Sequence, residues 1–194
     1  MVETASRLMQ SGLSPSVSEV AEAAEVSRAT AYRYFPSEVA LVDAVVDEAL
    51  GPILEWGCDL PDAEQRVRDL FEKSLPRIAE FEATFKAALR LSLDQWARAQ
   101  RGTLGEEPRF SRGHRKELLT EALSPLRGRL PQESLDRLAQ ALSLIFGIEV
   151  YTVLTDIWGL PVAHSADVAK WAACALVRAA VLEHEQNEAA SKGD

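Results

Sequence analysis

The chain has 194 residues, of which 47% are hydrophobic and 26% are charged, and this balance excludes a disordered or low-complexity polypeptide. Its formal net charge of −9 argues against a protein that binds nucleic acid through general electrostatic attraction alone. The two cysteines are too few for a disulfide framework, and no metal-type spacing links them.

The first predicted elements are three short helices near the N-terminus. A helix is predicted over residues 3–10. In the second helix, apolar and small residues recur at three- and four-residue spacing and share one face: Val17, Val20, Ala21 and Ala24. Ser16 or Ser18 can cap its start, and Ser27 is a natural cap for the third helix, residues 28–34. The polar, basic third helix predicts a helix-turn-helix, in which that helix enters the major groove of DNA.

A fourth helix is predicted from Ser37 to about Trp56, with a kink or break at Gly51-Pro52. It joins the DNA-reading head to the rest of the chain. We therefore predict a helix-turn-helix DNA-binding domain at residues 1–50 and a helical bundle for ligand binding and dimerisation at residues 51–194.

Residues 51–194 show helical periodicity, and no run alternates convincingly as a strand, so we predict an all-α fold of about nine helices. The fifth predicted helix is interrupted near Pro76, and the sixth runs from Ile78 to about Gln100. A short helix follows from His114 to Leu126, and a long one from Gln132 to about Trp158. The last predicted helix is capped by Ser165 and runs from Ala166 to about Gln186. Residues 101–113 are predicted to be a loop. The most apolar run, 138–154, is short for a membrane span and contains Gln140 and Glu149, which favours a buried helix.

The helix-turn-helix segment Ala-Glu-Val-Ser-Arg-Ala-Thr-Ala-Tyr-Arg-Tyr-Phe-Pro-Ser, residues 24–37, resembles the DNA-binding segment of the tetracycline-repressor (TetR) family. The strongest matches are Ala21, Ala24, Val26, Ser27, Thr30, Tyr32, Tyr34, Phe35 and Leu41. The resemblance covers residues 3–50 in detail and the remainder as helical layout. Two positions depart from the family pattern. Glu25 stands where the family usually has glycine, and Glu38 stands where it usually has a lysine that faces a DNA phosphate, so we expect Glu38 to repel DNA.

The resemblance implies a bacterial, cytoplasmic transcription regulator, most often a repressor, that binds an operator in double-stranded DNA. It assigns phosphate or base contact to Ser27, Arg28, Thr30, Tyr32, Arg33 and Tyr34. The alternative role for Tyr32 and Phe35 is to anchor the helix to its own core. For Phe35 we prefer that role, because its side chain has no polar group with which to read DNA.

The last two predicted helices carry an excess of apolar surface, and the final one pairs large apolar residues with alanines that allow close helix approach. In the TetR family the two C-terminal helices pack against their twins as a four-helix interface. The resemblance therefore implies a homodimer through these helices, and an ordinary intrachain core is the alternative.

An effector pocket for an unidentified small molecule is predicted where apolar side chains of the fifth to eighth helices face one another. Its candidate residues are Phe71, Leu75, Phe85, Leu89, Leu93, Trp96, Leu119, Leu123, Phe146, Glu149, Val150 and Leu154. Stripes of this kind are also typical of a simple core. The Glu149 carboxylate needs a partner if it is buried, and the candidates are Arg90, Arg112, Arg115 or a cationic ligand.

Catalysis finds no support in the sequence. The three histidines are scattered, and no nucleophile elbow, phosphate loop or metal cluster is present, so we predict no enzyme activity, no cofactor and no metal. The function that fits best is a ligand-responsive homodimeric repressor without membrane association. The alternative is a small-molecule-binding helical dimer of the same fold with weak or no operator binding.

Overall fold

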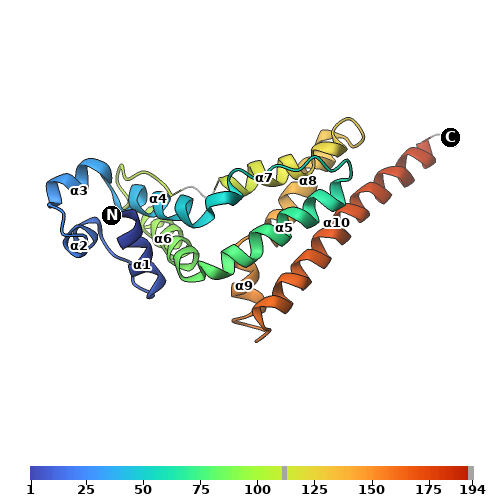
Figure 1. The fold of residues 1–194 in the computed structure, drawn as a ribbon. Helices are drawn as coiled ribbons and strands as arrows, with labels where there is room; N and C mark the ends of the chain where they lie inside the picture. Colours follow the sequence, from blue (N-terminus) through green and yellow to red (C-terminus); the bar gives the residue numbers. More distant parts are fainter. Residues whose placement is uncertain (111–112, 192–194) are drawn as a thin grey trace. The chain divides into compact units, whose positions relative to one another are not determined.

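The computed structural model describes residues 1–110 and 113–191, which form ten α-helices and two short 3-10 helices (Figure 1). No strand occurs in these residues, and the all-α prediction is confirmed. The helices form two compact units. The first unit contains residues 1–51 and 80–112, and the second contains residues 52–79 and 113–194.

The first unit is built around the N-terminal helices. Its elements are α1 (Val2–Gln10), α2 (Val17–Ala23), α3 (Arg28–Tyr34), α4 (Glu38–Leu50) and α6 (Glu82–Gln100). Helix α6 packs against both α1 and α4. Met9 of α1, Val42 of α4 and Leu91 of α6 are buried in one hydrophobic core, together with Phe110 from the segment after α6. The compact unit around the helix-turn-helix therefore includes residues beyond the predicted 1–50 stretch, because α6 and Phe110 cover apolar surface of α1 and α4.

The segment after α6 is fastened to that helix by one buried amide side chain, that of Gln95. Its Nε2 donates to the Pro108 carbonyl at 2.9 Å, and its Oε1 accepts from the Phe110 amide at 2.8 Å. An ion pair of 2.7 Å between Arg98 and Glu107 lies beside it. The predicted loop has no regular element in residues 103–110, and its residues 111–112 lie outside the described part of the chain.

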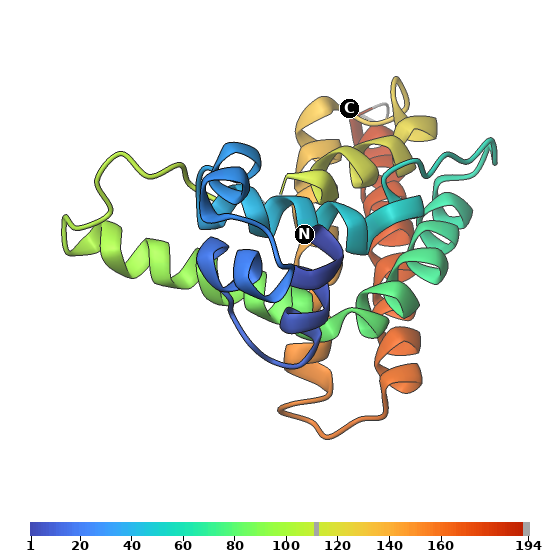
Figure 2. The same ribbon diagram turned by 60° about the vertical axis from the view of Figure 1, so that its left-hand side comes forward.

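The second unit contains the remaining helices. They are the 3-10 turn η1 (Gly51–Ile53), α5 (Ala63–Glu80), α7 (His114–Ala122), η2 (Ser124–Leu126), α8 (Gln132–Ser143), α9 (Ile148–Leu154) and α10 (Val162–Ser191). Helix α10 packs along α8 and α9, and both views show it as one long rod (Figures 1 and 2). In the core, the rings of Phe71 and Phe146 lie 5.1 Å apart, and the buried Tyr151 hydroxyl donates to the Leu75 carbonyl at 2.7 Å.

Two predicted helix boundaries are wrong. Helix α5 runs through Pro76 and ends at Glu80, so the break before α6 falls at Phe81. A proline inside a helix removes one backbone hydrogen bond and favours a kink, but it does not oblige the helix to end. Helix α10 begins at Val162, directly after Pro161, and Ser165 is buried within its first turn instead of capping it. Proline is well suited to a helix start, and it supplies the boundary here.

The predicted long helix from Gln132 to Trp158 is also wrong, because it is broken into α8 and α9 with a bend of 55°. Gly147 lies at the break with φ 132 and ψ −165, a conformation open almost only to glycine. In a continuous helix the Ser143 carbonyl would accept from the amide of Gly147. Here it accepts from Nη1 of Arg115 at 3.0 Å, so a side chain of α7 replaces a helical hydrogen bond at the break.

Within the described ranges, no single helix combines the length and apolar character needed to cross a membrane. Only α8 and α9 taken together meet that criterion, as a bent pair.

Candidate nucleic-acid interface

The two helices of the predicted helix-turn-helix are fixed by their caps. Ser16 and Glu19 form a capping box at the start of α2, in which the Ser16 hydroxyl accepts from the Glu19 amide and the Glu19 carboxylate accepts from the Ser16 amide. Ser27 caps α3 by accepting from the Thr30 amide at 3.2 Å. Ala31 is the fully buried residue of α3, and its small side chain lets α3 pack closely on α2.

The turn between these helices contains Glu25 at φ 55, which is a left-handed backbone conformation. The Val26 amide of this turn donates to the Ala21 carbonyl at 2.9 Å, so the chain closes on the end of α2 before α3 begins. A residue with a Cβ is strained there, and glycine avoids that strain. The turn has the geometry that the resemblance implies, although the residue in it is unfavourable.

The outer face of α3 presents basic and aromatic side chains to solvent. Arg28 and Arg33 are exposed, and Tyr32 and Tyr34 are 46% and 64% exposed. The guanidinium of Arg33 lies over the Tyr34 ring at 5.1 Å from its centroid. Large aromatic side chains left in water next to arginine are typical of a surface that binds a partner, because both groups can contact phosphates and base edges.

The structure places the six predicted DNA-contacting residues together on or next to α3. Ser27 and Thr30 are engaged with each other, since the Ser27 hydroxyl also donates to Thr30 Oγ1 at 2.9 Å. The Tyr32 and Ser18 hydroxyls share a hydrogen bond of 3.3 Å, which links α3 to α2 and leaves the ring exposed. Phe35 packs half-buried against the core, as expected for an anchor.

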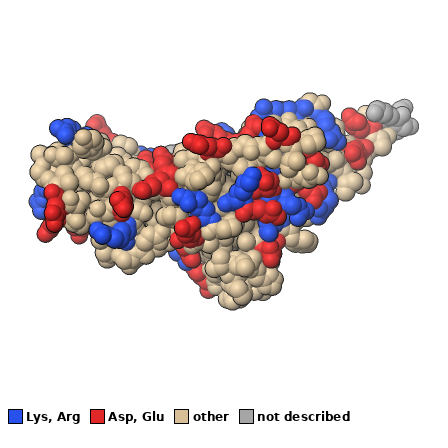
Figure 3. Space-filling model, in the orientation of Figure 1, with Lys and Arg blue, Asp and Glu red and all other residues tan. Residues whose placement is uncertain are grey.

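Charge around this face is mixed. Residues 1–50 contain three basic and eight acidic side chains. On the face drawn in Figure 3, charges of both signs are scattered over the end that carries α2 and α3, without a continuous basic surface. Positive charge is concentrated on α3 itself, which carries Arg28 and Arg33 and no acid. DNA contact at this head would therefore depend on a few well-placed groups more than on the net charge of residues 1–50.

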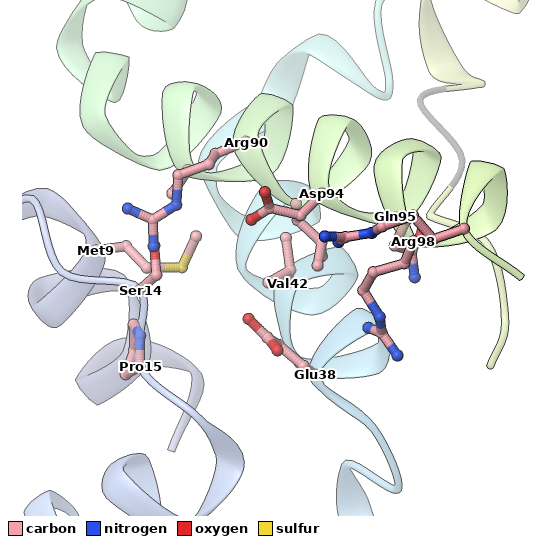
Figure 4. Close-up of a pocket in the computed structure, with 12 residues that line it drawn as sticks. Met9, Ser14, Pro15, Glu38, Val42, Arg90, Asp94, Gln95 and Arg98 are labelled. Carbon is pink, nitrogen blue, oxygen red and sulfur yellow. The ribbon is translucent and has the colours of Figure 1, made fainter. Parts of the chain in front are cut away.

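Glu38 lies exposed at the start of α4, and α6 gives it neighbours that the sequence did not indicate. Its carboxylate points into a cavity that also contains Arg90, Asp94 and Arg98 of α6 (Figure 4). Desolvation by the surrounding protein, followed by the Glu107 carboxylate, raises the pKa of Glu38, and Arg90 and Arg98 partly oppose this shift. The position of α6 in this unit brings its charged residues to Glu38.

The twelve predicted effector-binding residues are divided between the two units. The α6 residues belong to the first unit, where Leu93 and Trp96 are exposed and Phe85 and Leu89 are half-buried. In the second unit, Leu154 is half-buried, and the fully packed members are Phe71, Leu75, Leu119, Leu123, Phe146 and Val150. The second-unit members form a hydrophobic core, which is the alternative that the sequence left open.

Glu149 has an arginine partner, which is one of the two predicted outcomes. Arg115 Nη2 donates to both of its carboxylate oxygens, at 3.1 and 2.9 Å. Of the other candidates, Arg90 belongs to the first unit and Arg112 lies outside the described residues. Gly147 is part of the same arrangement, because a Cβ there would lie 2.7 Å from Arg115 Nη2 and 2.7 Å from Glu149 Oε2. Gly147 is not among the predicted site residues, although a glycine inside an apolar helical run is a signal of a special backbone position.

Residues 2–45 match the family model described as bacterial regulatory proteins, tetR family. The match spans α1, α2, α3 and the first part of α4. The search of curated proteins found no match. In the portion of the chain that the structure describes, no group of three or more His, Cys, Asp or Glu side chains is arranged to hold a metal ion.

Proposed function

We propose that this chain is a DNA-binding transcriptional regulator of the tetR family, whose model matches residues 2–45, and that it is a repressor that binds its operator as a homodimer and releases it when a small molecule occupies the second unit. The observation that carries the proposal is the α3 face, where Arg28, Arg33 and Tyr34 are exposed on a helix held by the Ser27 cap. A helix presented in this way fits the major groove, and its arginines can contact guanine or phosphate.

Homodimer formation is supported by apolar side chains that the second unit leaves in solvent. Ile157, Trp158 and Trp171 are 74%, 72% and 69% exposed. The other large exposed apolar residues between α8 and the end of α10 are Leu144, Val153, Val162 and Leu182. Exposed apolar residues in this number favour an interface, and a second copy could bring the same helices to cover them.

Release by a ligand is supported by the composition of the second unit. Its core includes a Phe71–Phe146 ring contact and the buried Tyr151, and a part-buried Arg115–Glu149 ion pair lies at the α8–α9 break. A ligand that entered this core would replace apolar contacts and shift α5 or α9. The chain continues from α4 through η1 into the second unit, so such a shift has a covalent route to the head.

The test is a titration of a fluorescent duplex taken from the region upstream of the chain's own gene, followed by anisotropy. A shuffled duplex of the same length and composition is the control. We expect tighter binding to the upstream duplex, one dimer per site, and two half-sites about one helical turn apart, which corresponds to about 34–36 Å. Equal affinity for both duplexes at every salt concentration would contradict operator recognition.

The second candidate function is a small-molecule-binding dimer with weak or no operator binding. The excess of acidic over basic side chains in residues 1–50 favours it. The same titration distinguishes the two functions. The second function predicts equal affinity for the upstream and shuffled duplexes even at low salt, where electrostatic binding is strongest.

A further inference from the structure

A cavity of about 260 Å³ lies within the first unit, between α4, α6 and the segment that joins α1 to α2. Three buried apolar residues, Met9, Val42 and Leu91, line part of it. Charged side chains of both signs line much of the remainder, and most of them come from α6 (Figure 4). Its volume is just below the usual range of small-molecule sites, so it suits a small metabolite.

The charged residues of α6 face this cavity because of their spacing. Arg90, Asp94 and Arg98 recur every four residues, which places them along one side of the helix, and Arg101 follows about one turn later. Figure 4 shows the Asp94 carboxylate lying between the Arg90 and Arg98 side chains. Glu38 at the start of α4 directs a second carboxylate into the same space.

Most of these charges have no ion-pair partner in the protein. Arg98 is held by Glu107 at 2.7 Å. By contrast, Glu38, Asp94, Arg90 and Arg101 make no ion pair with any residue in the two described ranges. The surrounding protein partly desolvates the Glu38 carboxylate, whose pKa is raised for that reason first. The Glu38 and Asp94 side chains remain accessible from solvent, so their carboxylates can receive a cationic group of a ligand that enters the cavity.

The positive and negative side chains that line the cavity together determine which class of ligand fits it. A simple anion would be attracted to Arg90 and Arg101 but repelled by Glu38 and Asp94, and a simple cation would meet the reverse. A molecule that carries an ammonium and a carboxylate group can satisfy both sets, and a short apolar side chain can cover Met9, Val42 and Leu91. We propose that this cavity binds a zwitterionic α-amino acid, with its ammonium toward Glu38 and Asp94 and its carboxylate toward Arg90 or Arg101.

This site lies entirely within the unit that carries the helix-turn-helix, and it is separate from the effector pocket proposed for the second unit. Glu38 follows α3 by four residues, so an occupied cavity would hold the start of α4 next to the reading helix. The binding claim does not depend on DNA recognition and is tested without DNA.

The experiment is isothermal titration calorimetry of the intact protein with L-valine and L-leucine, and with N-acetyl-L-leucine and L-leucine methyl ester. The acetyl derivative lacks the positive charge and the ester lacks the negative charge. We expect one site per chain for at least one free amino acid, and a loss of at least about tenfold in affinity for both blocked forms. Failure of both free amino acids to bind, or equal affinity for either blocked form, would overturn the proposal.

Matched variants test the named side chains. Glu38→Gln and Arg90→Gln should each weaken amino-acid binding by at least about tenfold, because each removes one charge of the cavity. Glu22→Gln on α2 and Arg7→Gln on α1 remove exposed charges outside the cavity and should bind like the parent. Unchanged affinity in Glu38→Gln and Arg90→Gln would show that the ligand binds elsewhere and would reject this site. If one variant fails to fold by circular dichroism, the other and the blocked ligands remain decisive.

Discussion

Individual residues determine how well the helix-turn-helix is built, and Glu25 is the clearest case. It occupies a left-handed conformation at φ 55, where a Cβ costs about 1–2 kcal/mol. The acid is also exposed in a head that we propose approaches DNA phosphates. One position therefore affects both the stability of the turn and the local charge.

Glu25→Gly should stabilise the protein by up to about 1 kcal/mol, because relief of backbone strain outweighs the greater freedom of the unfolded chain. The measurement is the free energy of unfolding from urea denaturation. Glu22→Gly is the control, since this residue lies inside α2 and the same change should destabilise by about 1 kcal/mol. A similar decrease in the free energy of unfolding in both variants would show that Glu25 is not strained.

Arg33→Ala should weaken DNA binding with little change in unfolding free energy, because this side chain is exposed and lies over Tyr34 instead of in the core. If Arg33 contacts a phosphate, affinity should fall similarly for all sequences, and the salt slope should fall by about one unit for each protomer bound. Anisotropy titrations of the upstream and shuffled duplexes distinguish phosphate contact from base reading. A loss confined to one base position would indicate base reading, and no loss would remove Arg33 from the interface.

At the scale of elements, the break between α8 and α9 depends on parts of the chain that are distant in sequence. Arg115 of α7 hydrogen-bonds the Ser143 carbonyl and also pairs with Glu149 after the break. Gly147 permits that geometry because no side chain occupies the space. The break is therefore a packed feature of the second unit, in which Arg115 replaces the lost helical hydrogen bond of the Ser143 carbonyl.

Gly147→Ala should destabilise the protein by about 2–3 kcal/mol, because its backbone conformation excludes a Cβ and the new methyl would displace the ion pair. Gly159→Ala is the control. Gly159 is also at positive φ, at 68, but nothing lies within 4 Å of a Cβ there, so its cost should be about 1–2 kcal/mol. Thermal and urea unfolding measure the loss of stability in both variants. An equal loss in the two would rule out crowding at the ion pair.

Helix α10 presents Trp171 and Leu182 to solvent, and Ala175 lies between them half-buried. If this surface is the dimer interface, Leu182→Asp should weaken self-association by at least about tenfold, because an unpaired charge would be buried in it. Leu60→Asp makes the same change at an exposed leucine in the segment before α5 and should have no such effect. Sedimentation velocity at several concentrations measures both, and a monomeric parent protein would disprove the dimer.

At the scale of the whole molecule, the net charge of −9 limits how strongly DNA can be held by electrostatics. If the two arginines of each α3 are the main phosphate contacts, a dimer neutralises about four phosphates. The logarithm of the binding constant should then fall with the logarithm of salt with a slope of about −3.6. Titrations between low and physiological salt measure it. A slope near −8 or steeper would mean that basic residues outside α3 contact the backbone.

Sequence reasoning succeeded where the signals are local. Serine caps, short-range periodicity and the residues of the turn predict α1 to α4 and the set of side chains on α3. It failed where a distant partner decides the outcome, as at Ser143, whose carbonyl is satisfied by Arg115. The periodicity of α6 indicates a helix with apolar surface, but it does not identify α1 and α4 as the helices that this surface covers. The charged cavity was missed for the same reason.

The division of the chain into interleaved units has a consequence for synthesis. The first unit needs residues 1–51 together with residues 80–112, and its core includes Phe110 from the segment fastened by Gln95. The N-terminal helices therefore leave the ribosome long before the parts that cover them. Met9 and Val42 stay without their α6 contacts until more than half of the chain has been translated. We expect the apolar surface of the nascent first unit to stay accessible to chaperones during that interval, and the unit to fold only late in translation.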